Sequence, residues 1–148
     1  MTAQPQPQPH REPRASGPAL LVELTAAHAA LLERIAELGE ITGREAPTSL
    51  EYTSARMRLS QASIDRRTVL NRALRHLAER GDCADAVAKV RAADGELIAH
   101  SVMHLGKWTG QAIAADWAGY CGASKAMRDH MADTVRAEAE ALRPLLGR

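Results

Sequence analysis

The stretch TSLEYTSARMRLSQASIDRRTVLNRALRHLAERG, residues 48–81, has the ends and the spacing of one long helix. Thr48 and Glu51 have capping-box spacing, and Gly81 is typical of a helix end. Between these ends, apolar residues recur at intervals of three and four, which predicts a helix with one buried face. The residues expected on that face are Tyr52, Ala55, Leu59, Ala62, Ser63, Arg66, Leu70, Ala73, Leu74 and Leu77. Arg66 is the one charged residue among them.

The helical pattern continues on both sides of this stretch. Ala, Leu, Arg and Glu are abundant and Phe is absent, which favours helices over strands. We expect a helix over residues 18–43, a second that has Asp82 as its N-cap and runs through Trp108, and a third over residues 124–143. The stretch AGYCGAS, residues 118–124, is expected to form the turn before the third of these helices. Because short connections join four helices, the sequence predicts an all-α fold, an antiparallel up-and-down four-helix bundle.

The N-terminal segment differs in composition from the rest of the chain. Its opening, MTAQPQPQPHREPRAS, alternates Pro with Gln and holds no large apolar residue after Met1. Such a segment buries too little apolar surface to offset the entropy lost on ordering. We therefore expect a disordered Pro/Gln-rich tail over residues 1–16 and one four-helix bundle domain over residues 17–148, a length that suits a single core.

Charge and cysteine content narrow the function classes. The 19 basic and 18 acidic residues nearly cancel, so no bulk charge attracts nucleic acid or an anionic membrane. No secretory signal or spanning apolar run is present, and Cys83 and Cys121 are too few for a disulfide framework. We expect a cytoplasmic chain. Phosphate-binding loops and the GxSxG and HExxH signatures are absent from the sequence, and we assign no reaction.

Histidines and a glutamate occupy positions expected to face the interior. Counting about 1.5 Å per residue from the turns brings His28, His100, His104 and Glu138 to similar heights, with His130 nearby. Imidazole and carboxylate groups bind zinc, iron, nickel and copper, and two histidines at i and i+4 can share one ion. The sequence thus predicts a transition-metal site, with zinc favoured. Glu138 is either a ligand or the acceptor that fixes a histidine tautomer.

The same residues permit an interior without a metal. Arg66 and Glu138 are able to form an internal ion pair, and histidines on apolar stripes are commonly hydrogen-bonded core residues. In that alternative, the chain is a protein-interaction bundle with a buried polar network. Its expected partners are a second copy of the chain, in a homodimer, or a signalling protein.

The stretch 96–134 resembles a known family. LGKW, followed by His130 in AMRDHMADT, is similar to the core of the chemoreceptor zinc-binding domain, a helical bundle of bacterial signalling proteins. The resemblance implies a sensory or regulatory zinc site, with His28 of LTAAHAALLERI as the first-helix ligand and His130 opening the final ligand pair. Met103 stands where that family has a cysteine, and Thr134 where it has its last histidine.

Two further resemblances keep other functions open. The order His28, HSVMH at 100–104 and His130 is similar to the ligand order of hemerythrin-like bundles, which implies a di-iron centre. HLGK resembles the motif of histidine phosphotransfer bundles. That resemblance implies that His104 accepts a phosphoryl group, with Lys107 three positions along.

Overall fold

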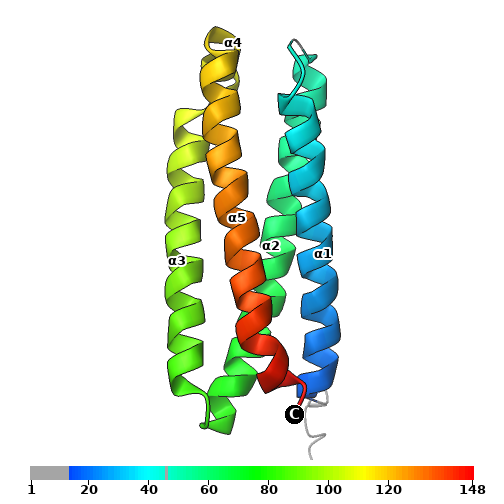
Figure 1. Cartoon of the computed structure of the whole chain (residues 1–148), viewed down its shortest axis with the longest axis vertical. Helices are drawn as coiled ribbons and strands as arrows, with labels where there is room; N and C mark the ends of the chain where they lie inside the picture. Colours follow the sequence, from blue (N-terminus) through cyan, green and yellow to red (C-terminus); the bar gives the residue numbers. More distant parts are fainter. Residues whose placement is uncertain (1–13, 46) are drawn as a thin grey trace, which may run out of the picture.

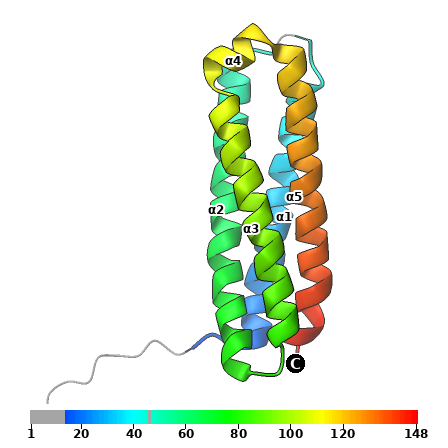
Figure 2. The same cartoon turned by 90° about the vertical axis from the view of Figure 1, so that its left-hand side faces the viewer.

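The computed structural model describes residues 14–45 and 47–148, and every regular element among them is a helix. The all-α prediction is confirmed, with five helices in place of four. In chain order they are α1 (Gly17–Thr42), α2 (Ser49–Arg80), α3 (Ala84–Lys107), α4 (Gly110–Ala115) and α5 (Trp117–Leu146). The four long helices lie side by side, and α4 sits at the end away from the C-terminus (Figures 1 and 2). The predicted tail lies, as far as residue 13, outside the described residues.

Helix ends follow local capping chemistry. Ser16 accepts a hydrogen bond from the backbone N–H of Ala19, which fixes the start of α1. The predicted capping box is confirmed: Glu51 N–H donates to Thr48 Oγ1 at 3.3 Å, and Thr48 N–H donates to Glu51 Oε2 at 2.8 Å. Gly81 ends α2 with a φ of 81°, a conformation that costs glycine little because it has no Cβ. The predicted bounds of α2 are therefore correct.

The connection between α3 and α5 differs from the prediction. The turn expected at residues 118–124 lies inside α5, and the chain turns earlier, around the short helix α4. Thr109 and Asp116 each accept a hydrogen bond from the backbone N–H three residues later, so two N-caps follow one another. An N-cap contributes about 1 kcal/mol. These caps offset the weak helix propensity of the glycines in AGYCGAS, which sequence reasoning read as a turn.

The start of α3 also differs from the prediction. Cys83, not Asp82, occupies the N-cap position, and its side chain makes no capping hydrogen bond. The Asp82 carboxylate instead accepts hydrogen bonds from Cys83 Sγ and Arg80 Nε, each at 3.1 Å. These bonds lower the pKa of Asp82 to about 2.

Two apolar clusters fill the interior, one toward each end of the molecule. One contains Leu31, Leu38, Leu59, Leu97, Tyr120 and Met127 among others, and lies toward α4. The other contains Leu20, Leu24, Leu70, Leu74, Leu77 and Leu142 among others. The packing between neighbouring helices is unequal, because α2 packs much more extensively against α1 than against α3. None of the described helices has both the length and the apolarity required to cross a membrane.

Candidate functional site

A layer of four charged or titratable side chains separates the two apolar clusters. It takes one residue from each long helix: His28 from α1, Arg66 from α2, Asp94 from α3 and Glu138 from α5. We call this set the charged layer. All four residues are buried, with Arg66 0% and Glu138 3% exposed.

The local sequence explains why these residues face inward. His28 lies between Leu24 and Leu31, which belong to different apolar clusters. A spacing of three or four residues keeps a side chain on the same face of a helix. In the described part of the chain, each of the four stripes therefore carries one buried His, Arg, Asp or Glu side chain into the core at about the same height.

The contacts within the charged layer are short and use both oxygens of Glu138. His28 Nε2 lies 2.6 Å from Glu138 Oε2. Arg66 donates from Nη2 to Glu138 Oε1 at 2.7 Å and to Asp94 Oδ1 at 3.0 Å, and from Nε to Glu138 Oε2 at 3.2 Å. The ion pair between Arg66 and Glu138, predicted as the alternative to a metal site, is confirmed.

The electrostatics keep Glu138 ionised. Burial alone raises the pKa of Glu138, but hydrogen bonds from His28 and Arg66 outweigh it and leave that pKa below its usual value. Burial likewise opposes the charge of Arg66, and its bonds to Glu138 and Asp94 raise its pKa overall. Because an ionised carboxylate only accepts hydrogen bonds, His28 Nε2 carries the proton between them. That nitrogen is therefore occupied.

Asp94 is the member of the charged layer that sequence reasoning missed. It is buried on α3 between Val90 and Leu97, four residues from one and three from the other. The inward face expected from the sequence for this helix has Val87, Val90, Leu97, His100, His104 and Trp108, with no residue between positions 90 and 97. The gap of a full heptad was the signal that an intervening residue faces inward.

A second polar contact joins α3 to α5. The Nδ1 atoms of His100 and His130 lie 2.7 Å apart, and both side chains are half-buried. At this distance one Nδ1 donates a proton and the other accepts it. His130 precedes Glu138 by eight residues, or about 12 Å along α5, so this pair lies apart from the charged layer.

His104 makes neither of these contacts. It is half-buried one turn beyond His100, and its ring lies 6.1 Å from that of Tyr120. Burial, together with the charges of Arg56 and His100, lowers the pKa of His104.

The structure thus divides the five predicted ligands among three places. His28 lies with Glu138, His100 with His130, and His104 by itself. Over residues 14–45 and 47–148, no three His, Cys, Asp or Glu side chains are placed to share a metal ion.

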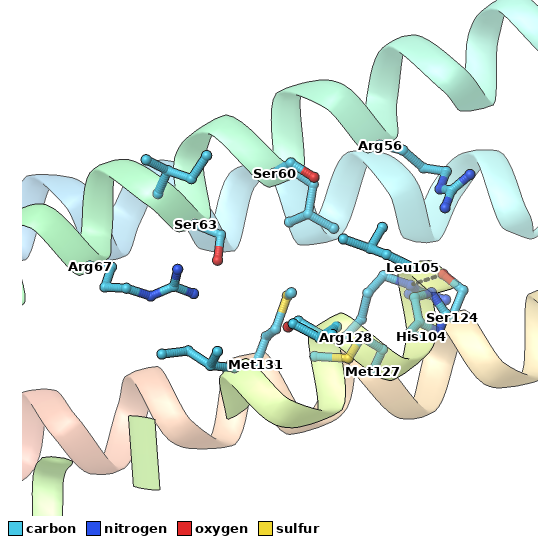
Figure 3. A pocket seen from close by; sticks show the side chains of 15 residues that line it. Arg56, Ser60, Ser63, Arg67, His104, Leu105, Ser124, Met127, Arg128 and Met131 are labelled. Carbon is cyan, nitrogen blue, oxygen red and sulfur yellow. Dashed lines mark hydrogen bonds between the residues drawn. The ribbon is translucent and has the colours of Figure 1, made fainter. Parts of the chain in front are cut away.

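A groove of about 200 Å³ lies between α2 and α3, with α5 as its floor. We call it the α2–α3 groove. Its apolar lining includes Leu59, Ile64, Ile98, Val102, Met127 and Met131. Arg56 and Arg67 stand at opposite ends of its α2 wall, with Arg128 near Ser124 on the α5 side (Figure 3).

The three arginines of the groove are not neutralised by acidic side chains. Arg56 donates to the carbonyl oxygen of Trp108 at 2.8 Å, and Arg128 donates to the hydroxyls of Thr42 and Ser124. Arg67 Nε is buried without a hydrogen-bond partner. In the described part of the chain, no carboxylate lies within ion-pair distance of any of the three. The groove therefore combines an apolar lining with uncompensated positive charge.

Exposed apolar side chains gather on the two helices that form the groove. Six large ones on α2 and α3 are 50–74% exposed, and three of the six, Ile64, Val102 and Leu105, line the groove. The other three are Leu50, Met57 and Met103. A cluster of this kind on a helical surface is typical of an interaction site.

Comparisons with models of known protein families, with curated proteins and with solved structures found no match. The resemblances to chemoreceptor zinc-binding domains, hemerythrins and histidine phosphotransfer bundles therefore stay predictions. A functional assignment for this chain rests on the geometry of the charged layer, the histidine pair and the α2–α3 groove.

Proposed function

We propose that the chain is a metal-free protein-interaction module built as an antiparallel four-helix bundle, with its binding face between α2 and α3. The observation that carries the proposal is that three exposed apolar side chains, Ile64, Val102 and Leu105, line the α2–α3 groove. Because a partner that covers them removes apolar surface from water, association through this face is favourable. The side-by-side arrangement of α1, α2, α3 and α5 supports the bundle (Figure 2).

The charged layer supports an interior without a resident metal. Both carboxylate oxygens of Glu138 already accept hydrogen bonds, and His28 Nε2 holds a proton. A metal ion at this level would stand close to the buried guanidinium of Arg66, and two cations in a poorly solvated interior repel each other strongly. In this proposal the layer is structural, and the partner binds elsewhere.

The proposed function is tested by site-specific photo-crosslinking in cells that express the chain naturally. A photoreactive side chain at Leu105, which lines the groove and is half exposed, should give an adduct with a partner, whereas the same group at Val22, an exposed residue of α1, should not. The partner is then identified by mass spectrometry and purified. Ile64→Asp should weaken its binding by roughly tenfold or more, because a charge replaces an apolar contact at an exposed position. Equal cross-linking at both positions, or none at either, would contradict the proposal.

A second candidate function, metal binding in a sensory or regulatory role, is favoured by the histidine pair. The Nδ1 atoms of His100 and His130 converge from α3 and α5. Two imidazoles are suitable zinc ligands, with further positions taken by water or by His104 one turn along α3.

Elemental analysis of protein purified without chelator, with thermal melts before and after EDTA, tests this candidate. One zinc ion per chain that is lost in His130→Ala and retained in His76→Ala would support it. Bound metal stabilises the folded chain, so EDTA should then lower the melting temperature. No metal, and no stabilisation by added zinc, would exclude the pair as a metal site.

A further inference from the structure

We propose that the partner of the α2–α3 groove is an acidic amphipathic helix, which lies between α2 and α3 with its carboxylates against Arg56, Arg67 and Arg128. This inference rests on the proposed interaction function and names its partner.

The apolar surface has the repeat of a helix-binding site. On α2, Met57 and Ile64 are seven residues apart, and on α3 Ile98 and Leu105 have the same spacing. Seven residues correspond to two turns, or about 10 Å. A helix that binds in a groove uses anchors at i, i+3 or i+4, and i+7, which cover the same length. Both walls therefore offer rows of apolar side chains that match one face of a partner helix.

The charge around the groove requires acidic groups on that helix. Arg56 and Arg128 bond only to neutral oxygens, and Arg67 Nε is buried with no partner in the described part of the chain. A buried donor without a partner is unfavourable, because it has lost its hydrogen bonds to water. A carboxylate of a partner can accept a hydrogen bond from Arg67 Nε and so satisfy this donor. A partner with positive charge at this place is repelled by the arginines.

The exposed side chains of the α2–α3 groove favour a helix over a small apolar anion as its occupant. Ile64, Val102 and Leu105 line the groove, and each is at least half exposed. A ligand that fits within about 200 Å³ fills the groove and leaves much of these side chains in water. A helix laid across the groove covers the rims as well.

The arginines also disfavour a second copy of the chain as occupant. A twofold dimer through this face is isologous, so the same patch meets itself. The groove arginines of one copy would then lie close to those of the other. Their mutual repulsion opposes this dimer, whereas an acidic helix is attracted.

The test uses a synthetic peptide and the full chain. The probe is a fluorescein-labelled helix of about 16 residues with leucines at i, i+4 and i+7 and glutamates beside them, a length that follows from the helix-in-groove mode. A matched peptide carries lysines in place of the glutamates. Fluorescence anisotropy at low salt should show the glutamate peptide binding roughly tenfold more tightly or better, with the difference shrinking at high salt.

Charge reversal in the protein makes the test specific. Arg67→Glu should weaken binding of the glutamate peptide and strengthen binding of the lysine peptide. Arg91→Glu, at an exposed arginine of α3 outside the groove lining, should change neither affinity. Arg67→Gln removes the charge with a smaller change in shape. It should weaken glutamate-peptide binding even if Arg67→Glu fails to fold.

The outcomes separate this inference from the proposed function. Equal affinity for the two peptides, or binding of neither while cross-linking at Leu105 persists, overturns the acidic helix and leaves the interaction module standing. Absence of both peptide binding and cross-linking overturns both. Tight binding of dodecanoate in place of the glutamate peptide identifies a small apolar anion and overturns the helix. The acidic helix is also overturned if sedimentation detects a dimer of the chain and Val102→Glu dissociates that dimer.

Discussion

Arg66 and Arg67 are consecutive residues of α2, and they occupy opposite electrostatic situations. Arg66 points into the charged layer and bonds to two carboxylates, Asp94 and Glu138. Arg67 lines the α2–α3 groove with no ionised partner in the described part of the chain, and Figure 3 shows it at one end of the α2 wall. One residue along a helix is a rotation of about 100°, which is enough to move a side chain from the core to a groove. The same residue type is thus structural in one place and available for binding in the next.

The largest expected effect on the free energy of unfolding comes from replacing these two arginines one at a time. Arg66→Met leaves Asp94 and Glu138 buried without their cation and should lower the free energy of unfolding by about 3–5 kcal/mol. Arg67→Met removes a buried donor that has no partner in the described part of the chain, so it should not lower the free energy of unfolding. Urea denaturation of both variants measures the difference. Similar losses in the two variants would show that Arg67 is as structural as Arg66.

A smaller loss of stability should appear at acidic pH, and we expect protonation of Glu138 to be its cause. Its pKa is lower in the folded chain than the ordinary value of 4.5, so the unfolded chain binds the proton first as the pH falls. The stabilisation is therefore complete above about pH 4.5 and is lost as the pH drops toward the folded pKa. Urea midpoints from pH 6 to pH 3 should fall less steeply for Glu138→Gln than for the unchanged chain.

Glu140→Gln is the matched control for this acid effect, because Glu140 is exposed on the same helix. Its urea midpoints should follow those of the unchanged chain. An unaltered slope in Glu138→Gln would mean that this carboxylate does not contribute to the acid dependence.

The smallest expected effect belongs to His104 beside the groove. Burial is the main cause that lowers its folded pKa below 6.5, so the unfolded chain takes up this proton first. Stability should therefore decrease as the pH falls below about 6.5. His104→Gln should remove that part of the pH dependence in thermal melts between pH 7 and pH 5.5. Persistence of the full slope in the variant would assign it to other groups.

Local signals in the sequence predicted much of the fold. The capping box and Gly81 defined α2, and apolar spacing identified its buried face, including Arg66. These features depend on residues within one or two turns of each other. The junction around α4 was missed because its ends depend on Thr109 and Asp116 acting as caps, which competed with the turn signal of nearby glycines.

The candidate site was predicted less completely, since it depends on how helices align. Counting residues placed His28 and Glu138 at one height, and they are in contact. The same counting placed His100 beside them, although it pairs with His130 instead. An error of one or two turns decides which side chains meet. The α2–α3 groove could not be predicted from local sequence patterns, because the unequal packing of α2 against α1 and α3 is a property of the assembled helices.

The charged layer also limits how the helices can slide past one another. A shift of α5 by one turn, about 5.4 Å, would bring Leu142 to the level of Glu138 and leave the Arg66 guanidinium facing an apolar side chain. Piston-like motion along the long axis is therefore strongly opposed at this level. A conformational change along the molecule costs less as a sideways separation of α2 and α3, which pack more loosely than α1 and α2, α1 and α5, or α3 and α5.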